Sequence, residues 1–134
     1  MLKTMLKTMR NIMMLALVGL LAGCVSGPTK MFESKANQAL SAGIDAYDEG
    51  KYPDAVKNLQ SALDQGLSVS DQVMAHKYLA FTHCVSGKER LCREEFRKAL
   101  DINPNLELEP AEMGHPTWGP VFRGVKTRKP DTKK

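Results

Sequence analysis

The feature that most constrains the fold is a helical hairpin pattern that occurs twice. Within each copy, apolar residues recur three and four positions apart, which places them on one face of a helix. A glycine, Gly50 or Gly87, separates the two segments of a copy. The four expected helices cover roughly residues 32–49, 53–65, 71–86 and 90–102. Because one hairpin cannot bury its apolar stripe alone, the repeat predicts an all-α protein in which two hairpins stack.

Small residues lie at matching positions of the two copies. They are Gly43, Ala55, Ala62, Ala80, Cys92 and Ala99. Together with Gly50, Gly87 and Pro104, these residues form a pattern that resembles the tetratricopeptide repeat, over residues 36–69 and 73–106. The resemblance implies two antiparallel helical hairpins within residues 32–106, whose first helices line a concave surface.

The sequence departs from the repeat family in three respects. Leu67 stands where the first copy would have a proline, and 37 residues separate Gly50 from Gly87, against a family period of about 34. The first helix of each copy also lacks the family's Trp and Tyr. The residues at those positions are Ala39, Ala46, His76 and His83.

A Pro-rich segment follows the repeats and is expected to cover them. Two repeats are fewer than the three or so that such a stack usually needs. Residues 107–122 contain three prolines, which disfavour one long helix, yet Trp118 and its apolar neighbours are unsuited to a free tail. We expect this segment to wrap over the repeats with Trp118 as its main anchor. Residues 123–134 hold six basic residues and one acid and are expected to form a disordered tail.

The start of the chain has the layout of a bacterial secretion signal. Basic residues precede an apolar run that is too short to span a bilayer, and a Leu-Ala-Gly-Cys sequence ends at Cys24. This sequence resembles the lipobox of bacterial lipoproteins. The resemblance implies that residues 1–23 are a signal peptide, that Cys24 carries covalent lipid, and that residues 24–31 tether the fold. Val25 in the position after the cysteine favours the outer membrane.

The charge distribution does not indicate nucleic-acid binding. The formal net charge is +4, but the surplus of Lys and Arg lies in the leader and the tail, and residues 24–122 carry more acids than bases. The tail could contact anionic lipid headgroups or remain solvated. The chain contains no nucleophile elbow, Gly-rich phosphate loop or metal-ligand spacing. We therefore expect no enzyme activity, and no cofactor besides the lipid on Cys24.

The other two cysteines lie across the turn of the second hairpin. In an oxidising compartment we expect a disulfide between Cys84 and Cys92, and two buried free thiols are the alternative. These cysteines could also bind zinc together with His76, His83 and His115. Since the two helical histidines occupy positions where the repeat packs aromatic rings, we expect no metal site.

The first helices of the two hairpins supply the candidate partner-binding groove. The resemblance to the repeat family places six residues there: Leu40, Ile44, Tyr47, Met74, Lys77 and Phe81. An apolar groove of this kind suits a partner peptide or helix. Residues 105–122 of the same chain could fill the groove instead.

These features predict a membrane-anchored adaptor that faces the periplasm, binds an envelope protein, and helps to assemble or stabilise an envelope complex. An accessory lipoprotein of a secretion system is one such adaptor. Two alternatives stay open. One is a structural lipoprotein that self-associates as a homo-oligomer. The other is a periplasmic metal or redox protein that uses the cysteines and histidines.

Overall fold

The structure is a computed structural model, and it describes residues 34–128. These residues form six helices and no strand: α2 (Lys35–Asp48), α3 (Tyr52–Gln65), α4 (Val69–Val85), α5 (Glu89–Ile102), α6 (Pro110–Met113) and α7 (Gly119–Lys126). The expected signal peptide, lipidated Cys24 and tether lie outside the described residues, as does the end of the expected tail. Within residues 34–128, no helix is long and apolar enough to cross a membrane.

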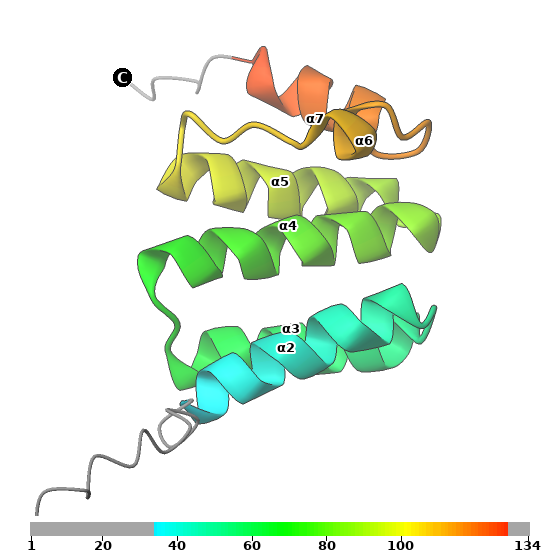
Figure 1. The fold of residues 1–134 in the computed structure, drawn as a ribbon. Helices are drawn as coiled ribbons and strands as arrows, with labels where there is room; N and C mark the ends of the chain where they lie inside the picture. The colour runs from blue at the N-terminus through cyan, green and yellow to red at the C-terminus, as the bar shows by residue number, and fades with distance from the viewer. Residues whose placement is uncertain (1–33, 129–134) are drawn as a thin grey trace, which may run out of the picture. The chain divides into compact units, whose positions relative to one another are not determined.

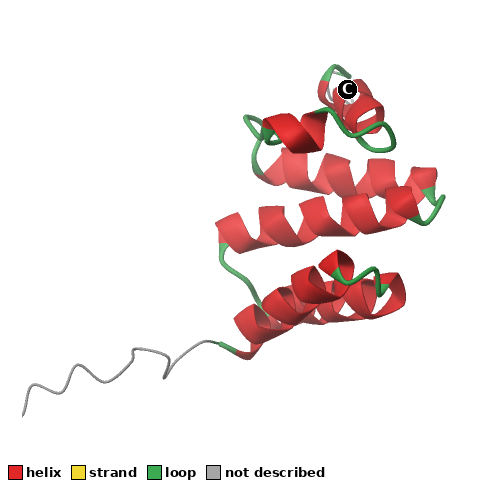
Figure 2. Ribbon diagram, turned by 45° about the vertical axis from the view of Figure 1, so that its right-hand side comes forward, coloured by secondary structure: helices red, strands yellow, loops and turns green. Residues whose placement is uncertain are grey.

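The described helices stack in layers, which confirms the expected all-α fold with two tetratricopeptide-like hairpins. Figure 1 shows α2 and α3 as one antiparallel pair and α4 and α5 as a second pair above it. The short helices α6 and α7 lie across the far side of the second pair, and α7 packs against α5 (Figure 2). The second hairpin is therefore enclosed between the first hairpin and the C-terminal helices.

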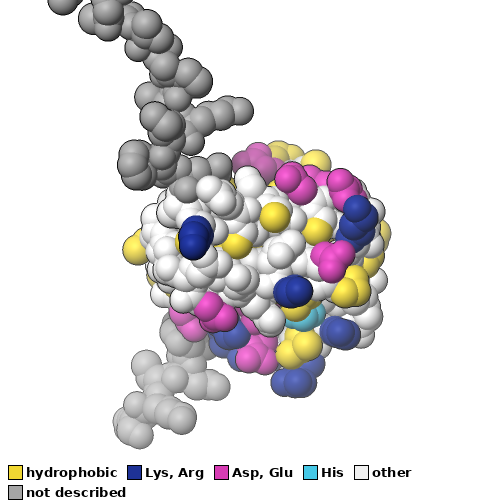
Figure 3. All heavy atoms as spheres, turned by 90° about the horizontal axis from the view of Figure 1, so that it is seen from below, with side chains coloured by type: hydrophobic (Ala, Val, Ile, Leu, Met, Phe, Trp, Pro, Cys, Tyr) yellow, Lys and Arg dark blue, Asp and Glu magenta, His cyan; other side chains and the backbone are white. Residues whose placement is uncertain are grey.

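The outer layer of α2 and α3 faces the viewer in Figure 3, which looks at the molecule from below. Acidic and basic side chains lie mainly toward the edges of this view, and apolar side chains appear as separate small patches. Such a face suits the terminal unit of a helical stack, which needs a polar outer surface.

The two hairpin turns have the same backbone geometry. Gly50 has a φ of 73° and Gly87 a φ of 72°, a conformation that glycine adopts without steric cost. In each turn the next residue, Lys51 or Lys88, donates its backbone N–H to a carbonyl in the preceding helix at 2.8 Å. The two hairpins are therefore structural copies, with Lys51 and Lys88 in equivalent positions.

The longer spacing between the turns is explained by an extra turn at the start of α4. Helix α4 has 17 residues, whereas α2, α3 and α5 have 14 each. The sequence placed the start of this helix near residue 71, but its N-cap is Ser68, whose hydroxyl accepts the backbone N–H of Asp71 at 3.2 Å. The same hydroxyl donates to the Asp71 carboxylate at 2.7 Å. This arrangement places Val69 at the helix start, where 67% of it is exposed.

Small side chains allow the paired helices to approach closely. A Cβ added to Gly43 on α2 would lie 2.6 Å from the side chain of Leu59 on α3, which is closer than van der Waals contact permits. Five other small residues of the repeat pattern are fully buried, namely Ala55, Ala62, Ala80, Cys92 and Ala99. Larger side chains at these positions would push the helices apart.

We predict that Ala99→Leu lowers the free energy of unfolding by about 1–3 kcal/mol, because the added methyl groups have no room in a filled core. Urea denaturation followed by circular dichroism measures this change. The same substitution at the exposed Ala111 is the control and should change stability by less than about 0.5 kcal/mol. Equal effects at the two sites would contradict the close packing of α5.

The C-terminal boundary differs from the sequence-based expectation. The tail was expected to begin at Arg123, but α7 continues to Lys126. The reason is the burial of Phe122 and Val125, since Phe122 packs edge-on against Phe96 of α5 with ring centroids 5.2 Å apart. Lys126 also donates to the Leu106 carbonyl at 2.9 Å. Residues 123–126 are therefore part of the covering segment.

Candidate protein-binding surface

Helices α2 and α4 present a partly exposed surface with several large side chains. We define the α2–α4 face by Ile44 and Tyr47 of α2 with Met74, Lys77 and Tyr78 of α4. Tyr47 contacts Tyr78 edge-on, with ring centroids 5.5 Å apart, so the side chains of the two helices meet. Met74 is 41% exposed, an unusual exposure for a large apolar residue within residues 34–128. The face therefore joins four of the six predicted groove residues with Tyr78.

The other two predicted groove residues are buried. Leu40 is 6% exposed and lies in the core between the hairpins with Leu59 and Leu79. Phe81 is 2% exposed, and the Trp118 ring stacks on it with centroids 4.5 Å apart. Neither residue reaches the surface in this structure, so a partner could contact only the remaining four.

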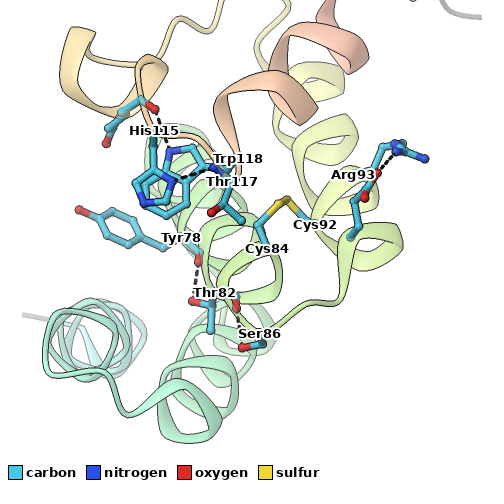
Figure 4. The surroundings of a disulfide bond; sticks show 11 residues. Tyr78, Thr82, Cys84, Ser86, Cys92, Arg93, His115, Thr117 and Trp118 are labelled. Carbon is cyan, nitrogen blue, oxygen red and sulfur yellow. Dashed lines mark hydrogen bonds and ion pairs between the residues drawn. A yellow bond between two sulfur atoms is a disulfide. The ribbon is translucent and has the colours of Figure 1, made fainter.

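The C-terminal segment covers the Phe81 end of the expected groove. Trp118 is 7% exposed, and its indole N–H donates to the Glu112 carbonyl at 2.8 Å. The His115 ring stacks in parallel on the Trp118 ring, with centroids 3.3 Å apart, as Figure 4 shows. Trp118 thus anchors the C-terminal segment, and this segment fills the Phe81 end of the expected groove.

An ion pair joins α4 to α6 at the edge of the face. The Lys77 ammonium lies 2.7 Å from the Glu112 carboxylate, and both side chains are mostly buried. The same ammonium lies 5.4 Å from the centroid of the Tyr78 ring and 5.6 Å from that of Phe81, within the range of cation–π attraction. Lys77 was expected to meet a partner, but in the structure it holds the C-terminal segment.

Tyr47 lies at the centre of the aromatic cluster. Its ring is near those of Tyr52, Tyr78 and Trp118, at centroid distances of 6.1, 5.5 and 6.5 Å. Burial raises the pKa of the Tyr47 phenol to about 12, and the neighbouring phenols and the carboxylates of Asp48 and Glu112 add to this effect. The phenol therefore stays protonated at neutral pH and can donate a hydrogen bond from the face.

Cys84 and Cys92 form a disulfide in the structure. Their Cα atoms are 5.1 Å apart, because the tight turn at Gly87 brings the end of α4 close to the start of α5. The bond belongs to the same core cluster as Trp118 and is shown in Figure 4, with Cys84 5% exposed and Cys92 fully buried. The sulfur atoms are therefore shielded from solvent and are not part of the α2–α4 face.

The three histidines lie in separate environments. His76 pairs with Glu95 of α5 at 2.7 Å, His83 is buried near the end of α4, and His115 stacks on Trp118. Among residues 34–128, no group of three or more His, Cys, Asp or Glu side chains is placed to hold a metal ion. The structure therefore does not bring together the cysteines and histidines that the sequence analysis considered as zinc ligands.

Glu95 is buried, and each of its two carboxylate oxygens has a hydrogen-bond partner. Burial alone would raise the pKa of Glu95, but hydrogen bonds from His76 and Lys98, each 2.7 Å long, outweigh burial and lower it. The carboxylate is thus charged at neutral pH and cross-links α4 to α5. The burial of Glu95 has no local signal in the sequence, because the residue stands within a run of charged residues.

We predict that acid weakens the fold through His83. Burial lowers the pKa of His83 below its ordinary value, so the unfolded chain binds a proton more readily than the folded chain. Stability should therefore fall as the pH drops below about 6.5, until the folded protein is also protonated. Urea midpoints at pH 7.5 and pH 5 measure this loss. The loss should be smaller in His83→Gln than in the natural chain, and unchanged in His115→Gln. An equal loss in the natural chain and both variants would contradict the role of His83.

Three residues in or beside the α2–α4 face were not predicted from the sequence. Tyr78 lies one position away from the helix positions that the repeat resemblance assigns to the groove, although it stands three residues before Phe81 on the same side of α4. Glu112 and His115 belong to the C-terminal segment, and nothing in a single sequence specifies which helix such a segment will contact.

Comparison with known proteins supports the fold and gives a distant relationship. The chain is 31% identical over 81 residues to the Photosystem I assembly protein Ycf3 of Synechococcus sp. (strain CC9605), which covers 59% of this chain and 47% of that protein. The protein of the same name from Synechococcus sp. (strain CC9902) is 30% identical over 81 residues, with the same coverage. The chain thus spans about half the length of the curated relatives it matches.

No family model matches the chain, and no solved structure matches it. The distant similarity and the stacked hairpins agree with each other. The chain is a tetratricopeptide-like helical protein with distant similarity to a protein named for assembly.

Proposed function

We propose that the chain is a protein-binding adaptor, tethered to a membrane through lipid on Cys24, that faces the periplasm and helps to assemble or stabilise an envelope complex. A role beside a secretion system fits this proposal, as the resemblance to small envelope lipoproteins implies. The α2–α4 face is the surface through which the adaptor would bind its partner.

The observation that carries the proposal is the open part of this face. Met74 exposes an apolar side chain on a rigid helix next to Lys77 and Tyr78, which are three and four residues away and so lie on the same side of α4. The phenol of Tyr47 supplies a hydrogen-bond donor beside them. Apolar contact area with a few polar groups at its edge is the composition of a protein-binding surface.

The relatives support the class of function. They are named as assembly proteins, and a small helical scaffold without a catalytic motif is suited to holding other proteins. The membrane anchor and the periplasmic side rest on the lipobox resemblance at Cys24.

A site-specific crosslinking experiment tests the binding surface. A photo-crosslinking amino acid replaces Met74 in the full chain in native membranes, and Val69 is replaced in the same way as a control. Val69 is also apolar and exposed on α4, but it lies about 140° around the helix from Met74, since each residue turns an α-helix by about 100°. We expect an envelope protein to crosslink at position 74, to be absent at position 69, and to be lost when Ile44→Glu is added.

Two results would count against this surface. Crosslinks of the same proteins at both positions would indicate nonspecific contact. A crosslinked species of twice the chain's mass would indicate self-association, which is the structural-lipoprotein alternative.

The membrane anchor has a separate test. We expect Cys24→Ser to move the protein from the membrane fraction to the soluble fraction and to abolish metabolic labelling with a palmitate analogue. Cys84→Ser changes a cysteine within the fold and should keep both properties. Labelling that persists in Cys24→Ser would rule out the anchor.

A further inference from the structure

A small pocket lies between the two hairpins, at the end where both turns are found. Its lining comes from the start of α3 and from the end of α4 with the turn that follows: Tyr52, Pro53, Val56, His83, Ser86 and Lys88. Its volume is about 180 Å³, which is room for a few small groups, since one water occupies about 30 Å³ in the liquid. The adaptor role makes no use of this pocket.

His83 brings an imidazole ring without a hydrogen-bond partner to the pocket. Its side chain is 94% buried, as its exposed fraction is 6%, and it makes no hydrogen bond with any residue of the described range. Among residues 34–128, no side-chain nitrogen or oxygen that lacks a partner is fully shut off from solvent, so the unpaired ring nitrogen of His83 is open to the pocket. A ring nitrogen that lines a pocket without a protein partner is therefore available to a bound molecule.

The charge state of His83 makes it a hydrogen-bond donor. Burial lowers the pKa of His83, and the four charged groups around it act in opposite directions. Glu95 and Glu94 raise this pKa, whereas Lys88 and Lys98 lower it. The imidazole is thus neutral at pH 7 and carries one N–H and one acceptor nitrogen.

The other polar groups of the pocket favour an anion. No acidic residue lines it, and the Lys88 ammonium pairs with no carboxylate of residues 34–128. The Ser86 hydroxyl already donates to the Thr82 carbonyl at 2.7 Å. Helix α3 starts at the pocket without a side-chain cap, so its first N–H groups add partial positive charge.

The walls restrict the anion to a small one with an apolar part. Pro53 and Val56 supply apolar surface to the pocket, and an anion with an alkyl part gains contact there that an anion without one does not. A single carboxylate on a short alkyl group matches both the donors and the walls.

We infer that this pocket binds a short aliphatic carboxylate. The Lys88 ammonium pairs with the carboxylate, the His83 imidazole and the Tyr52 hydroxyl donate hydrogen bonds to it, and Pro53 and Val56 contact the alkyl group. The same chemistry is offered by a free carboxylic acid and by the carboxyl terminus of a polypeptide.

Nuclear magnetic resonance of the histidine rings tests the inference on the purified full chain. Propionate is added, and the Cε1–H signal of His83 is followed, with the signals of His76 and His115 as internal references. We expect a saturable shift of the His83 signal alone. The pKa of His83 should also rise on binding, because a carboxylate beside the ring favours its charged form.

A matched pair of variants separates the pocket from general charge attraction. Lys88→Met keeps the aliphatic stem but removes the ammonium, and should weaken propionate binding about tenfold or more, the usual effect of losing a charged hydrogen bond. Lys51 has the same backbone conformation in the equivalent turn, with a φ of −84° against −95° for Lys88, and does not line the pocket. Lys51→Met should therefore bind propionate as the natural chain does.

The remaining measurements identify whether the bound carboxylate belongs to a polypeptide terminus or to a free acid, and they can overturn the inference. A short peptide with a free carboxyl terminus that binds more tightly than propionate, while its C-terminal amide does not bind, assigns the site to polypeptide termini. Equal affinity of peptide and propionate assigns it to free carboxylates. The inference is overturned if propionate produces no saturable shift, if Lys51→Met is as weak as Lys88→Met, or if inorganic phosphate binds as well as propionate.

Discussion

Replacing Trp118 with alanine is expected to lower the free energy of unfolding by about 3–5 kcal/mol, the usual cost of deleting a buried aromatic side chain. Trp118 is 7% exposed and has the stacked rings of Phe81 and His115 on its two sides. Its removal opens a cavity above Phe81 and breaks the hydrogen bond to the Glu112 carbonyl. The C-terminal segment would then lose its main contact with the repeats.

Trp118 is the single tryptophan of the chain, so unfolding of the variant has to be followed by circular dichroism rather than by tryptophan fluorescence. Trp118→Phe is the matched control. It keeps an aromatic ring but loses the N–H donor, and should cost about 1–3 kcal/mol for the carbonyl left without its partner. A loss below about 1 kcal/mol in Trp118→Ala would mean that the segment does not stabilise the repeats.

Removing the disulfide is expected to have the second largest effect. The bond joins residues eight positions apart, and closing a loop of this length restricts the unfolded chain by about 2–3 kcal/mol in the chain-entropy description. Cys84→Ala with Cys92→Ala should lower the free energy of unfolding by at least this amount. Because both sulfur atoms are buried beside the core, lost packing adds to the change.

A comparison of redox states separates the two contributions. The natural chain is unfolded in urea with and without a reducing agent, and the double variant is measured under the same conditions. We expect the reductant to destabilise the natural chain and to leave the variant unchanged. If the natural chain is equally stable in both, the two cysteines are not joined in the purified protein.

Local patterns were sufficient to predict the helices and their pairing. The spacing of apolar residues identified α2 to α5, because a helix that packs on one side has to repeat its apolar residues every three or four positions. Gly50 and Gly87 marked the turns, since both adopt a positive φ. Small residues such as Ala55 and Ala99 indicated close helix contacts, and the structure buries them completely.

The boundaries and the exposed surface were harder to predict. The extra turn of α4 depends on Ser68, and the sequence offers several polar residues nearby that could cap a helix equally well. The end of α7 depends on Val125, which packs against the repeats although basic residues surround it in the sequence. In both cases a tertiary contact or a choice between similar caps sets the helix end.

The amino-acid sequence by itself determined that this chain forms stacked helical hairpins, because periodicity, turn glycines and small residues act within a hairpin. Only the tertiary structure decided which side chains of α2 and α4 remain open. Phe81 lies under Trp118, Lys77 is held by Glu112, and Met74 stays exposed. A helix pattern specifies which side of a helix is apolar, whereas the segment that covers this side comes from elsewhere in the chain and is placed by packing in three dimensions.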